Sequence, residues 1–206
     1  MEKFWIQSYP EGVPAEIDTT RYRSLVQLME EAFSKYAARN AYVCMDKFMT
    51  YAELDAMSKK LGAWLQGQGL SKGARVALMM PNVLQYPVAI AAVLRAGYVV
   101  VNVNPLYTPR ELEHQLNDSG AEAIIILENF ATTLEKVISR TQIKVAVVAS
   151  MGDLLGGAKG AIVNFVVPPP SSLNAAIQYS FAGISGANTR ISYVQFIVSD
   201  MTTNTI

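Results

Sequence analysis

Apolar residues recur every three or four positions in two early stretches of the chain, and this spacing predicts two amphipathic helices. The first would begin at Ser24, whose hydroxyl can cap it. The second would begin at Thr50, which forms a capping box with Glu53. Gly67 and Gly69 would end it, because a left-handed terminal residue is least costly as glycine. The apolar positions are Leu25, Leu28, Met29, Phe33 and Tyr36 in the first helix, and Leu54, Met57, Leu61, Trp64 and Leu65 in the second.

Short apolar runs between the helical stretches predict strands, at residues 41–45, 76–80, 98–103, 123–127 and 145–148. The β-branched run at 98–103 is typical of a fully buried strand. Further helices are expected from Asn82, with Pro87 in the first turn, from the capping box at Thr108 to Gly120, and over residues 130–140. This alternation predicts an α/β fold, a mostly parallel sheet with helices on both faces.

Charge divides the chain into two unequal parts. Residues 1–167 hold 16 basic and 16 acidic side chains, whereas residues 168–206 hold only Arg190 and Asp200. The junction is the run Pro168-Pro169-Pro170, which can continue neither a helix nor a central strand. We therefore expect an α/β domain over 1–167 and a separate tail over 168–206 that does not join the core. In that tail, the uncharged segment that begins at Ile191 and ends at Val198 predicts aggregation.

Composition excludes several classes of protein. The 17 basic and 17 acidic residues give no net charge, which argues against a nucleic-acid binder. One cysteine and one histidine cannot build a zinc site from soft ligands. Residues 76–94 carry no charge, but Pro81, Asn82, Gln85 and Pro87 interrupt them, so we expect no transmembrane helix there. No targeting segment is evident, so a cytoplasmic protein is expected.

Glycine-containing stretches suggest phosphate loops, but their spacing does not fit one. Gly73 follows Gly67-Gln68-Gly69 one residue too late for a dinucleotide fingerprint. In residues 152–160, a P-loop would place lysine directly after Gly157, where Ala158 stands. A slip of one residue misdirects the N–H groups that hold a phosphate. We therefore expect residues 152–160 to form a flexible surface loop.

Isolated reactive side chains fit structural roles. His114 lies one predicted helical turn after Glu111, and a hydrogen bond or ion pair between them would be ordinary. Cys44 is expected as a small core residue. Glu111 and Glu113 point to different faces and form no catalytic pair. We assign no catalytic, cofactor-binding or metal-binding residue. Three tyrosines lack an accompanying basic stripe and are expected in or beside the core: Tyr86, Tyr98 and Tyr107.

Two stretches resemble the first and second core motifs of one enzyme family: residues 49–54 read MTYAEL, and residues 94–105 read LRAGYVVVNVNP. That family is the adenylate-forming enzymes, which include acyl-CoA synthetases, luciferases and peptide-synthetase adenylation domains. Residues 106–121, reading LYTPRELEHQLNDSGA, look like the bacterial long-chain fatty acid–CoA ligases in particular, as do ALMMPN at 77–82 and QYP at 85–87. The similarity runs from about Phe4 to Val167.

The resemblance implies an enzyme that activates a fatty acid with ATP and Mg²⁺ as acyl-AMP and then transfers the acyl group to CoA. In the family a Ser/Thr/Gly-rich loop and a C-terminal lysine carry the chemistry. Neither is found here; residues 182–187, reading AGISGA, lack the threonines and the lysine. We therefore predict a truncated or aberrant ligase that is inactive alone, cytoplasmic or peripheral at the inner face of the membrane. The alternative is a non-catalytic binding or interaction domain that retains the scaffold.

Overall fold

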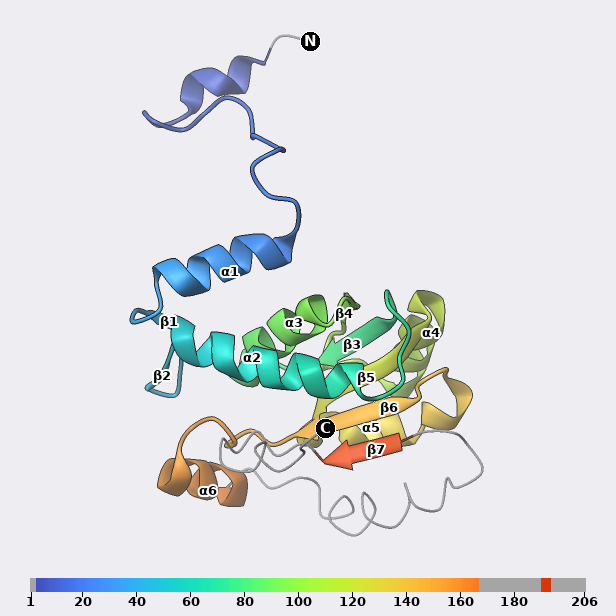
Figure 1. The fold of residues 1–206 in the computed structure, drawn as a ribbon. Coiled ribbons are helices and arrows are strands. Elements are labelled where there is room, and N and C mark those ends of the chain that lie inside the picture. The colour runs from blue at the N-terminus through green and yellow to red at the C-terminus, as the bar shows by residue number, and fades with distance from the viewer. Residues whose placement is uncertain (1–2, 167–189, 194–206) are drawn as a thin grey trace.

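The centre of the fold is a five-stranded parallel sheet (Figure 1). The structure is a computed structural model, and it describes residues 3–166 and 190–193. The strands lie in the order β4-β3-β5-β6-β7, and every neighbouring pair is parallel. Because β4 and β5 lie on opposite sides of β3, the winding reverses between β3 and β5. The strands are β3 (Arg75–Met79), β4 (Val99–Asn102), β5 (Ala121–Leu127), β6 (Val145–Ala149) and β7 (Arg190–Tyr193).

Helices cover both faces of this sheet. On one face, α2 (Tyr51–Gln66) and α3 (Gln85–Arg95) pack on one core; on the other, α4 (Pro109–Ser119) and α5 (Ala131–Glu135) pack on a second. Each strand contributes successive side chains alternately to the two cores, since successive strand residues point to opposite faces. In β3, Val76 and Leu78 belong to the first core and Ala77 and Met79 to the second. The predicted α/β fold with a parallel sheet and helices on both faces is confirmed.

Local capping signals fix where the helices begin and end. Ser24 accepts a hydrogen bond from the Gln27 amide at 3.1 Å and begins α1 (Leu25–Lys35). Thr50 and Thr108 each form the predicted capping box, at α2 and α4. Gly120 ends α4 at φ +63°, a left-handed conformation that glycine adopts without strain. These ends are encoded within a few residues of sequence.

A two-stranded antiparallel hairpin, β1 (Asn40–Cys44) and β2 (Lys47–Thr50), lies apart from the main sheet beside the start of α2 (Figure 1). Its turn places Met45 and Asp46 at φ +48° and +60°. The apolar strand predicted at residues 41–45 exists, but Tyr42 and Val43 are exposed. Cys44 is half-buried, and it packs against the core rather than within it.

Two sequence expectations about strands and helices are wrong. The run at 98–103 forms β4, which is the outer strand of the described sheet, and Val99 is 47% exposed. Residues 130–140 do not form one helix: α5 ends at Glu135, and a separate 3₁₀ turn covers Ile138–Arg140. Val137 leaves helical geometry and is completely buried. Core burial there overrides the local helical spacing.

Helix α3 begins later than predicted. Asn82 lies in a tight turn in which the Val83 amide donates to the Pro81 carbonyl, and α3 starts only at Gln85. Pro87 lies in the first turn, as expected, where its missing N–H costs no helical hydrogen bond. Among the described residues, no helix is long and apolar enough to cross a membrane.

The expected loop at 152–160 is wrong from Gly157 onward, where α6 (Gly157–Val166) begins. The reason is a close backbone approach: a Cβ on Gly152 would collide with the Gly160 carbonyl. The Gly152 amide also donates to the Asn164 side chain at 2.6 Å. The glycines therefore allow α6 to pack on the preceding turn, which is a structural role.

The described part of the tail joins the sheet. Arg190–Tyr193 forms β7, parallel to β6, so the expectation that nothing in 168–206 joins the core is wrong for these four residues. The proline run, residues 182–187 and the part of the aggregation-prone segment after Tyr193 lie outside the described residues. The boundary at Val167 stays a prediction.

Candidate functional sites

The first motif, residues 49–54, is the start of α2. Its Met49 is 2% exposed and anchors the helix start to the core. The Glu53 amide donates to the Thr50 hydroxyl at 3.2 Å, and the Thr50 amide donates back to the Glu53 carboxylate at 2.7 Å. This backbone hydrogen bond lowers the pKa of Glu53. The motif is thus a helix-initiating unit whose polar groups satisfy each other.

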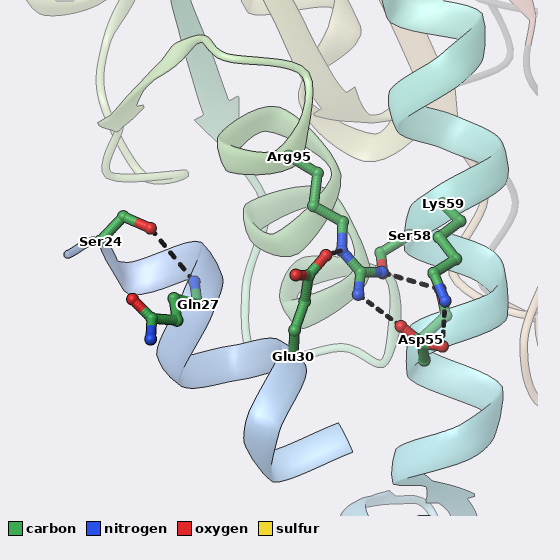
Figure 2. Close-up of polar contacts among 7 residues, drawn as sticks. All are labelled: Ser24, Gln27, Glu30, Asp55, Ser58, Lys59 and Arg95. Atoms are coloured by element: carbon green, nitrogen blue, oxygen red, sulfur yellow. Dashed lines mark hydrogen bonds and ion pairs between the residues drawn. The ribbon is translucent and has the colours of Figure 1, made fainter. Parts of the chain in front are cut away.

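Arg95, the second residue of the second motif, ends α3 and contacts α2, the helix that begins in the first motif (Figure 2). Its side chain is only 8% exposed. Its guanidinium donates to the Asp55 carboxylate, to the Asp55 carbonyl at 2.9 Å and to the Ser58 hydroxyl at 2.7 Å. Its Nε lies 3.6 Å from the Glu30 carboxylate on α1. We call these four residues, Arg95, Asp55, Ser58 and Glu30, the Arg95 centre.

The Arg95 centre holds three helices together. Arg95 comes from α3, Asp55 and Ser58 from α2, and Glu30 from α1 (Figure 2). The guanidinium also lies 5.0 Å from the centre of the Phe33 ring, a cation–π distance. Burial alone would raise the pKa of Asp55, but hydrogen bonds and charge from Lys59 and Arg95 lower it overall. The cluster is therefore a structural clamp with an ionised carboxylate.

Side chains beyond the second motif fix the end of β4. The Tyr86 hydroxyl donates to the Asn102 side chain at 2.8 Å, and Gln115 donates to the Asn102 carbonyl at 2.9 Å. These contacts join α3 and α4 to β4 across both faces of the sheet. Tyr98 is buried, and Tyr86 and Tyr107 are half-buried, so the expected core or rim placement of the three tyrosines is confirmed.

A buried polar cluster lies where β5 and β6 end, on the carboxyl side of the sheet. Gln85 is 1% exposed and donates to the Ser150 carbonyl at 2.7 Å. The Ser150 hydroxyl donates to Glu128 at 2.8 Å, and its amide donates to Asp153 at 2.9 Å. In open parallel sheets, ligands bind at the carboxyl ends of strands where the winding reverses, which here is between β3 and β5. This cluster therefore lies beside the edge favoured for binding, and sequence reasoning missed it.

Next to this cluster is a hollow of about 250 Å³ between β2, α2 and the turn before α6. Its wall is mainly apolar, and four charged side chains also line it. The lining residues are Lys47, Phe48, Met49, Glu53, Ala56, Met57, Lys60, Leu84, Asp153, Leu154 and Gly156. We call this space the β2–α2 hollow. No sequence motif marked it, because its residues come from four separate segments.

The isolated reactive residues are not brought together. His114 is exposed on α4, and no hydrogen bond or ion pair joins it to Glu111 in the part of the chain described. Glu111 is engaged in the Thr108 capping box, and Glu113 pairs with Arg140 at 2.8 Å, so their different directions are confirmed. Within residues 3–166 and 190–193, no three His, Cys, Asp or Glu side chains are grouped to hold a metal ion.

Comparison with known proteins finds sequence similarity over most of the chain. Residues 29–180 match the family described as AMP-binding enzyme. The chain is 54% identical over 194 residues to a long-chain-fatty-acid–CoA ligase of Salmonella typhimurium, covering 88% of this chain and 35% of that protein. It is 53% identical over 202 residues to the ligase of Yersinia pestis, covering 95% of this chain and 36% of that protein. The chain therefore spans about a third of the length of these curated relatives.

A solved structure agrees with these matches. A long-chain-fatty-acid–CoA ligase from Archaeoglobus fulgidus aligns with a TM-score of 0.58 and 26% identity, covering 68% of this chain and 29% of that one. The luciferase-like enzyme of the mealworm Zophobas morio aligns with a TM-score of 0.61 at 21% identity, which shows the fold alone. The fold is that of the N-terminal domain of these proteins.

Proposed function

The chain belongs to the AMP-binding enzyme family, and from that premise we propose that it is the N-terminal scaffold portion of a long-chain fatty acid–CoA ligase. The observation that carries this proposal is the 54% identity to a curated ligase over most of the chain. The whole enzyme would convert a fatty acid, ATP and CoA to acyl-CoA, AMP and pyrophosphate. The relatives favour this function over a non-catalytic interaction domain, because the curated proteins at about 50% identity or more are ligases.

The residues described here supply scaffold rather than chemistry. Adenylation brings a carboxylate against the α-phosphate of ATP, and this approach of two anions needs cations and N–H donors held in place. Arg95 is the one cation in the two motifs, and it is held by hydrogen bonds to α2 and by an ion pair with Glu30 of α1. We therefore propose that this chain alone does not form acyl-AMP, and that ATP, Mg²⁺, CoA and the fatty acid are partners of the longer enzyme.

A chimera tests the proposed function. Residues 1–166 would replace the corresponding segment of the Salmonella typhimurium relative, and fatty-acid-dependent pyrophosphate release would be measured beside the unaltered relative. A scaffold of the same function should support release within about tenfold of that control. A chimera that melts cooperatively at a similar temperature yet releases no pyrophosphate would contradict the proposal.

The origin of the tail has its own test. The nucleotide sequence across the codon for Val167 should contain a second reading frame that continues into a threonine-glycine loop. Such a frame supports a ligase altered by a frameshift, and its absence favours the non-catalytic interaction domain. We further propose a cytoplasmic location with peripheral contact at the inner face of the membrane. Flotation with vesicles tests the membrane contact.

A further inference from the structure

We infer that two copies of this chain form a two-fold symmetric dimer, in which Phe165 on α6 of each copy enters the β2–α2 hollow of the other. This contact involves no substrate of a ligase and is independent of the proposed function. Three features of the described residues support it: an uncovered apolar stripe on α6, the hollow beside that helix, and the spacing between the two.

Helix α6 is apolar on both of its sides, but the domain covers only one of them. Gly160 and Val163 are buried against the domain. On the other side Ile162 and Phe165 are 62% and 84% exposed. A helix that is apolar all round is normally buried on every side, so the exposed side is typical of a surface that another protein covers. We call this exposed side the α6 stripe, and it consists of Ala158, Ala161, Ile162 and Phe165.

No charged side chain interrupts the α6 stripe. The one charged residue of α6 is Lys159. It donates to the Met45 carbonyl and lies 3.8 Å from the Asp46 carboxylate, so it is directed at the hairpin. The whole chain also has no net charge, and a large net charge is what keeps copies of a protein apart in solution. A second copy can therefore approach the stripe without charge repulsion.

The β2–α2 hollow adjoins the start of α6, because Gly156, the residue before the helix, is part of its wall. That wall is mainly apolar, and Phe48 in it is 52% exposed, which leaves apolar area to cover. The volume of about 250 Å³ is below the roughly 300–1,000 Å³ of sites for small molecules and cofactors. It suits one large side chain, and a buried aromatic anchor of this kind dominates the binding energy of many protein interfaces.

The spacing between the hollow and Phe165 fits a two-fold axis. Phe165 follows Gly156 by nine positions, which is about 13.5 Å along a helix that rises 1.5 Å per residue. When two α6 helices pair antiparallel around Ala161, Phe165 of each copy comes opposite the hollow of the other. Ala158 and Ala161 are small, so the two helices can approach closely at the axis. Both copies then use the same surface, as a two-fold interface requires.

Charge complementarity favours the same pairing. Lys47 and Lys60 line the hollow, are exposed and form no ion pair within the described ranges of the chain. Glu53 and Asp153, which also line it, accept hydrogen bonds from backbone amides at 2.7 and 2.9 Å. The C-terminal end of a helix carries a partial negative charge, and α6 has no basic residue in its last turn. Phe165 lies in that turn, so its insertion brings the negative helix end of one copy to the two lysines of the other.

Sedimentation velocity of the full 206-residue chain tests the dimer, in the absence of ATP, CoA and fatty acid. We expect a monomer–dimer equilibrium with a micromolar dissociation constant, because the contact area is small. Phe165→Asp should weaken the dimer at least tenfold and leave the thermal midpoint of the monomer unchanged, since residue 165 is exposed there. Leu106→Asp is the matched control. Leu106 is 81% exposed and lies outside the stripe and the hollow, so this variant should dimerise as the parent chain does.

Variants of the hollow test the other half of the contact. Ala56 is exposed on α2 and lines the hollow, so Ala56→Phe should fill it and weaken the dimer at least tenfold. A mixture of Phe165→Asp and Ala56→Phe should dimerise more strongly than either variant alone, because the mixed dimer keeps one Phe165 and one open hollow that fit each other. The double variant Lys47→Gln, Lys60→Gln should weaken the dimer about two- to fivefold.

Several outcomes would overturn the dimer. One is a chain that stays monomeric at about 100 µM, well above a micromolar dissociation constant. Another is a dimer that Phe165→Asp or Ala56→Phe leaves intact, and a mixture of these two variants that gains nothing would exclude reciprocal insertion. A monomer that floats with phosphatidylglycerol vesicles through Phe165 would assign the stripe to a membrane surface. A monomer that instead binds, through Phe165, the separately expressed remainder of the Salmonella typhimurium relative would assign the stripe to the longer ligase.

Discussion

The guanidinium of Arg95 donates to the carboxylate of Asp55, forty residues earlier in the chain, and this ion pair ties the helix that begins in the first motif to the start of the second. A structural role explains this pair without any catalytic role for either residue. It is a buried clamp that aligns α2 on α3, the two helices that cover one face of the sheet (Figure 2).

Removing one partner of this pair should destabilise the domain strongly. Asp55→Ala leaves the Arg95 charge buried, and Arg95→Met leaves Asp55 with Lys59 alone. Each should lower the free energy of unfolding by about 1–3 kcal/mol, because the remaining group loses its main hydrogen-bond partner and keeps only Glu30 or Lys59 beside it. The double variant Asp55→Ala, Arg95→Met should cost less than the sum of the two single variants. Urea unfolding of the four chains checks this, and additive losses would contradict the clamp.

Acid should weaken the same clamp. The pKa of Asp55 lies below its ordinary value of 3.8 when folded, so its ionised form stabilises the fold. That contribution is present above pH 3.8 and is lost as the pH falls through the lowered pKa. The stability difference between the parent chain and Asp55→Asn should therefore shrink below pH 4. Glu113→Gln, in an exposed pair, is the control with a small effect at every pH. A stability difference between the parent chain and Asp55→Asn that stays constant down to pH 2 would contradict this role of the Asp55 carboxylate.

Much of the fold follows from local signals, and the rest depends on neighbours. Thr50 and Thr108 each carry their capping box within four residues, so the starts of α2 and α4 were predictable. The place of β4 at the edge of the sheet depends on strand order, which periodicity does not encode. The Arg95 centre joins distant segments, yet a signal existed: Arg95 directly follows an uncharged stretch of 19 residues, and a charge beside buried apolar helix needs a partner.

The candidate sites were less predictable than the fold. The β2–α2 hollow takes residues from β2, α2, α3 and the turn after β6, and no one segment carries a recognisable pattern. Gln85 and Ser150 are 65 residues apart, and their hydrogen bond depends on where α3 begins. Sequence marked Gln85 as a polar interruption of an apolar run and as part of the stretch QYP at 85–87, and neither signal predicts its burial. Its burial is what shows its role.

The composition of the tail predicts a preferred cleavage site. Limited proteolysis should cut first between Val167 and Ser172, at the proline-led junction, and leave a resistant N-terminal fragment. Mass spectrometry of the earliest products identifies the bond. First cleavage within β3 or β5 instead would contradict the boundary. Because Arg190–Tyr193 pairs with β6, the tail fragment should remain associated until denaturant is added.

The segment that begins at Ile191 and ends at Val198 should limit solubility. It is uncharged, rich in β-branched and aromatic residues and free of proline, which is typical of aggregating strands. Ending the chain at residue 189 should raise the concentration at which light scattering appears by several-fold. Equal solubility of the two chains would contradict this prediction.

We propose that this chain is a family scaffold that does not adenylate a fatty acid by itself. Loss of one stabilising donor in such a reaction costs about 10²–10³ in rate, and we expect this chain to lack several of them. The purified chain should be incubated with ATP, Mg²⁺ and a long-chain fatty acid while pyrophosphate is followed. We predict release no greater than in the control without protein. Release above that control that requires the fatty acid would contradict the claim.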